Sequence, residues 1–149
     1  MTVLEPGPGM GFFTLTLAEM VGPSGRVIAV EVQPKILASL RRRAARKALL
    51  ERLDLRLAQP DSMGLADLAG KVDFALAFAV VHEMPSAAVF FRETAEALKR
   101  GGEMLLAEPT GHVKAADFES ELGSAAEAGL RIEKRPEVPR SQTALLVKA

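Results

Sequence analysis

The feature that most constrains this chain is a glycine-rich turn close to the start of the sequence. Gly7, Gly9 and Gly11 stand at alternate positions, directly after a short apolar run (residues 3–4) and the carboxylate Glu5. Residues 12–20 then carry apolar side chains at helical spacing. Because glycine has no Cβ, it adopts positive φ and lets a ligand approach the backbone. The segment predicts a strand, a ligand-binding turn and a helix that presents its N-terminus to the ligand at the edge of a parallel sheet.

Composition limits the classes of protein that this chain can represent. Its 149 residues predict a single domain, and 48% hydrophobic with 26% charged residues is globular composition. The 19 basic and 19 acidic residues balance, so we expect no nucleic-acid partner, and we expect no membrane span and a cytoplasmic location. The chain has no cysteine, which excludes disulfides, thiolate metal sites and cysteine nucleophiles within it.

The rest of the chain alternates predicted strands with predicted helices. Strands are predicted over residues 1–5, 26–31, 53–58, 72–81, 103–107, 130–135 and 143–148, and helices over residues 11–21, 34–50, 65–68, 86–99 and 114–128. This order predicts an α/β fold: a doubly wound, mostly parallel seven-stranded sheet with helices on both faces. The last two strands have no helix between them, which predicts an antiparallel pair at one edge.

Polar residues gather where the predicted strands end, and such sheets bind ligands at that edge. Glu31 closes the second strand twenty residues after Gly11, where a carboxylate can accept the two hydroxyls of a ribose; the alternative is a solvent-facing strand end. Asp61 and Ser62 follow the third strand and can meet an adenine edge or form an Asx turn. Both histidines, His82 and His112, follow the fourth and fifth strands.

Two classes of nucleotide ligand compete for the glycine turn. A dinucleotide fold has the pattern G-x-G-x-x-G, whereas here Phe12 stands in the place of the third glycine. Glu5 lies two residues before the first glycine, where it would repel a pyrophosphate and favour a cationic ligand. A nicotinamide-dependent oxidoreductase stays open as the alternative.

At this point the sequence resembles the class I S-adenosylmethionine-dependent methyltransferases, which have a Rossmann-like fold. Residues 5–11 match the acidic-x-G-x-G-x-G motif of that family. Residues 98–102 resemble the L-K-P-G-G turn before the fifth strand, with Arg100 in place of the proline, and the antiparallel final strand also belongs to the family. Small-molecule enzymes, including the quinone-methylating branch, are the most similar in pattern.

The resemblance implies S-adenosylmethionine as cofactor, a small-molecule methyl acceptor and no metal. The residues that it assigns to the cofactor site are Glu5, Gly7, Pro8, Gly9, Gly11, Glu31, Val32, Gln33, Asp61, Ser62, Phe78 and Ala79. The implied mechanism is in-line transfer of the methyl group, for which the protein mainly supplies alignment and exclusion of water. A base is needed only if the acceptor must lose a proton.

His82 is the candidate base, because imidazole titrates near neutrality and its loop follows the fourth strand; the alternative is a loop histidine bonded to backbone. Glu83 and His112 are weaker candidates, and the three together are an alternative metal site without ligand spacing that requires one. A basic cluster lies on and after the second helix, and a solvated helix face explains it better than phosphate binding. Its members are Arg41, Arg42, Arg43, Arg46, Lys47, Arg52 and Arg56.

One departure from the family concerns the start of the chain. Family members carry N-terminal helices over the active site, whereas the first predicted strand here begins at about Thr2. The acceptor pocket is then unusually open, or a partner chain or second copy covers it, or the protein continues upstream. A non-catalytic partner subunit that binds S-adenosylmethionine therefore also stays open.

Overall fold

A computed structural model describes residues 1–9 and 11–149; Met10, the variable residue of the glycine turn, lies outside the described residues. The strands are β1 (Thr2–Pro6), β2 (Arg26–Glu31), β3 (Leu53–Leu57), β4 (Val72–Phe78), β5 (Leu98–Pro109), β6 (Leu130–Lys134) and β7 (Ser141–Lys148). The α-helices are α1 (Phe12–Val21), α2 (Pro34–Arg46), α3 (Ala87–Ala97) and α4 (Ala115–Glu127), with short 3-10 turns η1 (Leu50–Arg52), η2 (Ala66–Leu68) and η3 (Val81–Glu83).

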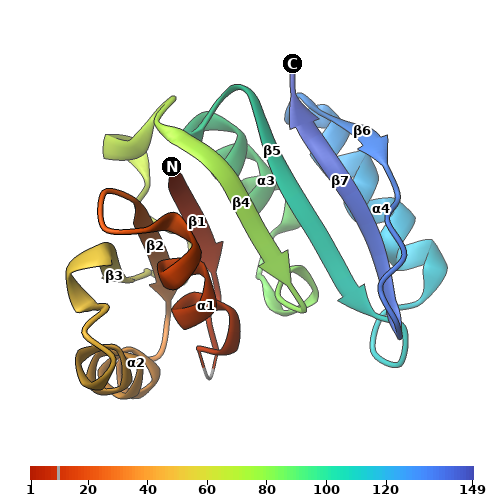
Figure 1. Cartoon of the computed structure of the whole chain (residues 1–149). Coiled ribbons are helices and arrows are strands. Elements are labelled where there is room, and N and C mark those ends of the chain that lie inside the picture. Colours follow the sequence, from red (N-terminus) through yellow and green to blue (C-terminus); the bar gives the residue numbers. More distant parts are fainter. Residues whose placement is uncertain (10) are drawn as a thin grey trace.

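The seven strands form one sheet in the order β3-β2-β1-β4-β5-β7-β6. Strands β1 to β5 pair in parallel, and β7 pairs antiparallel with both β5 and β6 (Figure 1). The predicted fold class is therefore confirmed, including the antiparallel pair near the edge. The strand order reverses between β1 and β4, so the carboxyl ends of these two strands flank the point where ligands bind in such sheets.

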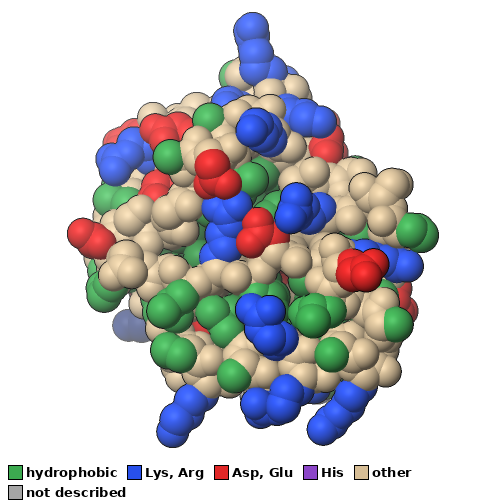
Figure 2. Space-filling view, turned by 90° about the vertical axis from the view of Figure 1, so that its left-hand side faces the viewer, with side chains coloured by type: hydrophobic (Ala, Val, Ile, Leu, Met, Phe, Trp, Pro, Cys, Tyr) green, Lys and Arg blue, Asp and Glu red, His purple; other side chains and the backbone are tan. Residues whose placement is uncertain are grey.

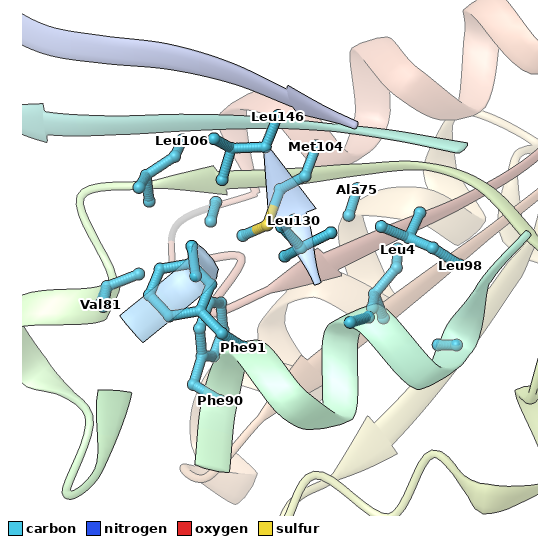
Figure 3. Close-up of a cluster of buried hydrophobic side chains, with 14 of the residues drawn as sticks. Leu4, Ala75, Val81, Phe90, Phe91, Leu98, Met104, Leu106, Leu130 and Leu146 are labelled. Carbon is cyan, nitrogen blue, oxygen red and sulfur yellow. The ribbon is translucent and has the colours of Figure 1, made fainter. Parts of the chain in front are cut away.

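Both faces of the sheet are apolar because neighbouring residues on a strand point to opposite sides. Val3, Val27 and Ala29 face a core formed with α1 and α2, whereas Leu4 and Ile28 face the core formed with α3, α4 and η2. In Figure 3, Phe90 and Phe91 of α3 reach toward strand residues of this second core, such as Met104 and Leu106. This double burial explains why β1 and β2 are almost continuously apolar in the sequence.

Helices cover the two faces unequally. α3 and α4 lie behind the sheet in Figure 1, whereas the near side of β4, β5 and β7 is not crossed by a helix of the described chain. Leu105, Leu145 and Val147 point to that side, opposite to the core residues beside them, and they are only partly buried. α1 and α2 thus cover β1 to β3 and leave the β5–β7 side open.

Several predicted boundaries were wrong where the backbone departs from regular geometry. The second helix ends at Arg46 rather than near Leu50, because Ala48 adopts a positive φ of 57°. The fourth strand ends at Phe78 rather than at residue 81, because Ala79 has a φ of 60° and η3 follows. Residues 98–102, predicted as the end of a helix, belong to β5, whose pairing with β4 shifts register there.

Candidate functional site

Glu5 joins the end of β1 to the helix that follows it. Its side chain is buried, and the hydroxyl of Thr14, a buried residue of α1, donates a hydrogen bond to Glu5 Oε1. Burial raises the pKa of Glu5 to about 7, against the opposing effect of the Thr14 hydrogen bond. A positive charge near this carboxyl group, at the switch point of the sheet, would therefore lower its pKa and favour the ionised form.

The glycine turn has the geometry that its sequence predicts. Gly7, Gly9 and Gly11 have φ values of 64°, 56° and 81°, a region that side chains rarely adopt. Gly7 N–H donates to the Val30 carbonyl of β2 at 2.7 Å, and a Cβ on Gly7 would collide with the Val80 side chain. The absence of a side chain at this position lets the β1, β2 and β4 exits meet.

The other two glycines open the turn and start the helix. Gly11 caps the N-terminus of α1 in the left-handed conformation, and its N–H donates to the Pro8 carbonyl at 2.9 Å. A Cβ on Gly11 would lie 2.6 Å from Leu40 Cδ1, whereas no described atom lies within 4 Å of a Cβ on Gly9. The backbone at Gly9 is therefore open to a ligand, and the buried Pro8 beside it is part of the turn.

Glu31 ends β2 next to the glycine turn, since its neighbour Val30 accepts the Gly7 hydrogen bond. Glu31 Oε2 accepts backbone hydrogen bonds from Val32 at 2.8 Å and from Gln33 at 3.1 Å, which orient the carboxylate. Val32 and Gln33 are exposed, and Gln33 precedes the first turn of α2. The predicted ribose ligand and the glycine turn thus lie together.

Asp61 and Ser62, the two residues predicted to meet the adenine, have different surroundings. Ala58 N–H donates to the Glu31 carbonyl at 2.9 Å, so the exit of β3 starts beside Glu31. Ser62, however, donates its hydroxyl to Glu93 Oε2 of α3 at 2.8 Å and accepts from Gly64 N–H at 3.1 Å. Asp61 is exposed at the tip of this turn. The structure therefore gives the Ser62 hydroxyl two protein partners and leaves the Asp61 side chain directed to solvent.

The exit of β4 is bent toward the glycine turn. Ala79, in its left-handed conformation, donates its N–H to the Ala107 carbonyl of β5 at 2.8 Å. The Phe78 ring packs against Phe13 of α1 with 4.9 Å between ring centroids, and Val80 packs over Gly7. Phe78 and Ala79 thus lie between the start of α1 and the start of η3.

His82 lies in η3 and is held by Glu108 at the exit of β5. Its backbone N–H donates to Glu108 Oε2 at 3.0 Å, and its Nδ1 lies 3.1 Å from Glu108 Oε1. The His82 side chain is 25% exposed and that of Glu108 is 0% exposed. The His112 ring stacks on the His82 ring with centroids 6.4 Å apart, and Glu83 Oε1 lies 3.8 Å from His82 Nε2.

No role was predicted from the sequence for Glu108, at the exit of β5, or for Glu121. Glu121 is a buried carboxyl of α4, and burial raises its pKa to about 8, with the carboxyl of Glu108 as the next cause. Glu108 could have been identified from the sequence as an acid at the end of an apolar strand. Glu121 carries no such signal, because its burial depends on how α4 packs on the sheet.

The described residues contain no group of three or more His, Cys, Asp and Glu side chains that could hold a metal ion. His82, Glu83 and His112 are neighbours, but the imidazole Nδ1 of His82 is directed to Glu108 rather than to a shared centre.

The basic cluster is divided among local partners. Arg56 pairs with Asp54 at 2.9 Å and with Asp67 at 2.7 Å, and Arg52 donates to the Ala18 carbonyl at 3.0 Å. Figure 2 shows the side of the molecule that carries α2 and β3, where Lys and Arg side chains are interspersed with acidic and apolar ones. Arg41, Arg42, Arg46 and Lys47, on and directly after α2, are exposed, and a solvated helix face stays the interpretation for them.

Together, the strand order, the acid before the three glycines and Glu31 beside them define the class I S-adenosylmethionine-dependent methyltransferase fold. Residues 3–102 match the family model of the methyltransferase domain. The chain belongs to this methyltransferase family, whose cofactor is S-adenosylmethionine.

One curated relative shares part of the sequence, and two solved structures share the fold. An arsenite methyltransferase of Halobacterium salinarum is 30% identical over 107 residues, which cover 72% of this chain and 27% of the relative. A SAM-dependent methyltransferase from Aquifex aeolicus superposes with a TM-score of 0.82 at 23% identity, covering 99% of this chain and 82% of that structure. The [4+2]-cyclase SpnF superposes with a TM-score of 0.80 at 18% identity, covering 99% and 75%.

The segment that aligns with this chain makes up less than a third of the length of each of the curated relatives that it matches. Among the residues that the structure describes, no helix is both long and apolar enough to cross a membrane.

Proposed function

We propose that this chain binds S-adenosylmethionine at the glycine turn and transfers its methyl group to a small-molecule acceptor by in-line displacement. The observation that carries the proposal is the hydrogen bond from Gly7 N–H to the Val30 carbonyl at 2.7 Å, which places the open glycine turn beside Glu31. When bound, the cofactor supplies an activated methyl group on a positively charged sulfur.

The residues at this edge fit such a cofactor. Gly9 offers backbone that no described side chain covers, and the Glu31 carboxylate is oriented for ribose hydroxyls by its two backbone hydrogen bonds. Glu5 is a buried carboxyl next to the turn, and a cationic ligand favours its ionised form. Phe78 and Ala79 would line the methionine side of the cofactor, and Val32 and Gln33 the ribose side. Asp61 would meet the adenine, because its exposed side chain does not share the hydrogen bonds that hold Ser62.

A nicotinamide cofactor is less compatible with this site. Phe12, at the position of the third glycine in the dinucleotide pattern, does not decide between a nicotinamide cofactor and S-adenosylmethionine. Phe12 is 81% exposed and does not enter the contact between helix and sheet. The separation comes from Glu5, since a buried carboxyl beside the turn would oppose a pyrophosphate. The family match favours the same choice.

His82 is the proposed base for acceptors that lose a proton. It follows the strand exit that packs over Gly7, and its side chain is 25% exposed, so an acceptor can reach it. The arsenite named for the relative from Halobacterium is not proposed as the acceptor here. Soft centres favour thiolate ligands, and these 149 residues contain no cysteine.

Calorimetry with S-adenosylmethionine and S-adenosylhomocysteine tests the proposal. We expect both to bind, and we expect Glu31→Ala to weaken binding by roughly tenfold or more, because a charged hydrogen-bond partner is lost. Glu127→Ala, which removes an exposed acid near the end of α4, is the matched control and should bind like the wild type. Absence of binding at millimolar ligand would reject the proposal, and unchanged affinity in Glu31→Ala would reject the ribose role.

Transfer of labelled methyl groups separates the enzyme from a non-catalytic binding subunit. If the chain binds S-adenosylmethionine but transfers no methyl group to any acceptor, alone or with partner proteins added, it is a non-catalytic binding subunit.

A further inference from the structure

Behind His82, two buried carboxyl groups extend into the protein. Glu108 accepts the backbone N–H of His82 on Oε2 at 3.0 Å, and the same carboxyl meets the ring Nδ1 at 3.1 Å. Because the backbone N–H is always a donor and a carboxylate only accepts, the pair is complete when Nδ1 also carries a hydrogen. Glu108 is 0% exposed, so water does not compete for these two bonds.

Glu121 of α4 is a further buried carboxyl, and the carboxyl of Glu108 contributes to its raised pKa. Glu121 is 8% exposed, and its Oε1 has no hydrogen-bond partner among the described residues. Burial is the largest cause that raises the pKa of Glu121 to about 8, followed by Glu108 and then by Asp117 on the same helix. Glu121 is therefore a second buried acid close to Glu108, and a substitution at Glu121 can serve as the control for one at Glu108.

The remaining titratable groups around His82 do not replace Glu108. His112 stacks on the imidazole face at 6.4 Å between centroids, and Glu83, whose side chain is 73% exposed, lies 3.8 Å from Nε2. Neither is within hydrogen-bond distance of Nδ1 in the contacts that the structure shows. The tautomer of His82 is therefore set from the buried side of the ring.

We propose that Glu108 is a positioning residue that holds His82 as the Nδ1–H tautomer with Nε2 free to accept a proton. This inference rests on the proposed function. It assigns the acceptor to compounds with a hydroxyl group, because Nε2 of a neutral imidazole held at Nδ1 by a carboxylate can take a hydroxyl proton.

The proton and electron balance is complete without another reactant. The hydroxyl proton of the acceptor passes to His82 Nε2, and the acceptor oxygen uses a lone pair to form the bond to the methyl carbon. The bond between that carbon and sulfur breaks with its electrons on sulfur, which becomes neutral. His82 becomes an imidazolium that is paired with the Glu108 carboxylate, and it later releases the proton to water.

Nitrogen NMR of the histidine side chains tests the tautomer directly, with the whole chain bound to S-adenosylhomocysteine. In the wild type we expect Nδ1 of the neutral His82 ring to carry the hydrogen and Nε2 to be unprotonated. An Nε2–H tautomer in the wild type would overturn the proposal, and this result needs no variant to fold. The same resonances must disappear in His82→Ala, which assigns them.

Glu108→Gln and Glu121→Gln form a matched pair. In Glu108→Gln the amide oxygen accepts the backbone N–H, and an NH2 group replaces Oε1 at 3.1 Å from Nδ1, where it opposes a hydrogen on Nδ1 and shifts the tautomer toward Nε2–H. Glu121→Gln keeps an uncharged donor beside Glu108, so the wild-type tautomer should persist. An unchanged tautomer in folded Glu108→Gln, or a reversed one in Glu121→Gln, would contradict the proposed arrangement.

Methyl transfer to nitrophenols, phenol and alkyl alcohols measures the acceptor class. We expect Glu108→Gln to lower the transfer rate by about a hundredfold or more, with unchanged calorimetric affinity for S-adenosylhomocysteine, and Glu121→Gln to stay close to the wild type. Absence of transfer to these phenols and to alkyl alcohols would overturn the hydroxyl acceptor. Absence of S-adenosylhomocysteine binding by the wild type would instead refute the proposed function, and the two failures are thereby distinguished.

Discussion

Glu5 shows how one buried carboxyl can make the stability of this fold depend on pH. Burial raises the pKa of Glu5 from 4.5 to about 7, so between these values the folded protein binds a proton that the unfolded chain has lost. The free energy of unfolding therefore falls as pH rises through this window, by an amount on the order of 3 kcal/mol. Chemical denaturation of the ligand-free protein between pH 5 and about pH 8 measures this slope.

Glu5→Gln is the variant that isolates this effect. The amide stays neutral and can accept the Thr14 hydrogen bond, so the decrease in stability with pH should become smaller. Glu121, whose pKa is also raised, keeps a residual slope of the same sign. If Glu5→Gln and the wild type lose the same stability between pH 5 and pH 8, the neutral carboxyl at residue 5 is not the source.

At the same scale, the sequence predicts the site residues that lie next to a motif and not those that depend on packing. Glu5 and Glu31 follow from their places before and after strand ends. The partner of Ser62 and the burial of Glu121 both depend on where α3 and α4 meet the sheet. No local pattern encodes those distances, so Glu93 and Glu121 could not be identified before the fold was known.

At the scale of a single element, glycine has opposite effects in α1 and α4. Gly11 caps α1 with a φ of 81°, and a Cβ there would lie 2.6 Å from Leu40 Cδ1. Gly123 lies inside α4, and a Cβ there would meet no described atom within 4 Å. We expect Gly11→Ala to destabilise the protein by about 1–3 kcal/mol through backbone strain and to weaken S-adenosylhomocysteine binding.

Gly123→Ala is the matched control for this substitution. It should stabilise the protein by roughly 0.5–1 kcal/mol, because alanine loses less backbone entropy in a helix, and leave ligand affinity unchanged. Urea denaturation and calorimetry on both variants check the pair. Equal stability of Gly11→Ala and the wild type would mean that the turn tolerates the strain.

The elements that were predicted correctly are those whose apolar period agrees with their final packing. β2, over Arg26–Glu31, has its predicted bounds because a continuous apolar run is buried on both faces. Two of the errors occur where a non-glycine residue takes a positive φ, at Ala48 and Ala79. Alanine is an ordinary helix or strand residue in sequence terms, so these turns carry no composition signal and are imposed by tertiary contacts.

For the whole molecule, the sheet is the structure that both cores share. Val3 and Leu4 are neighbours in β1, yet they enter cores on opposite faces, and β2 divides in the same way. The order of alternating strands and helices predicted this layered arrangement. It could not predict that α1 and α2 leave the β5–β7 side open, because coverage depends on helix placement rather than on helix number.

This shared sheet leads us to propose that residues 1–149 unfold as one cooperative domain. Leu40 on α2 and Leu106 on β5 are both almost fully buried, in cores on opposite faces, so they are a matched pair of probes. Leu40→Ala and Leu106→Ala should each cost about 3–5 kcal/mol. If the domain is cooperative, each variant lowers the urea midpoint of both faces equally, as measured by hydrogen exchange in α1–α2 and α3–α4. If Leu40→Ala lowers the protection of α1 and α2 alone, while α3 and α4 keep their wild-type protection, the two layers are separate folding units. A substitution on one face could then leave the other half of the cofactor edge intact.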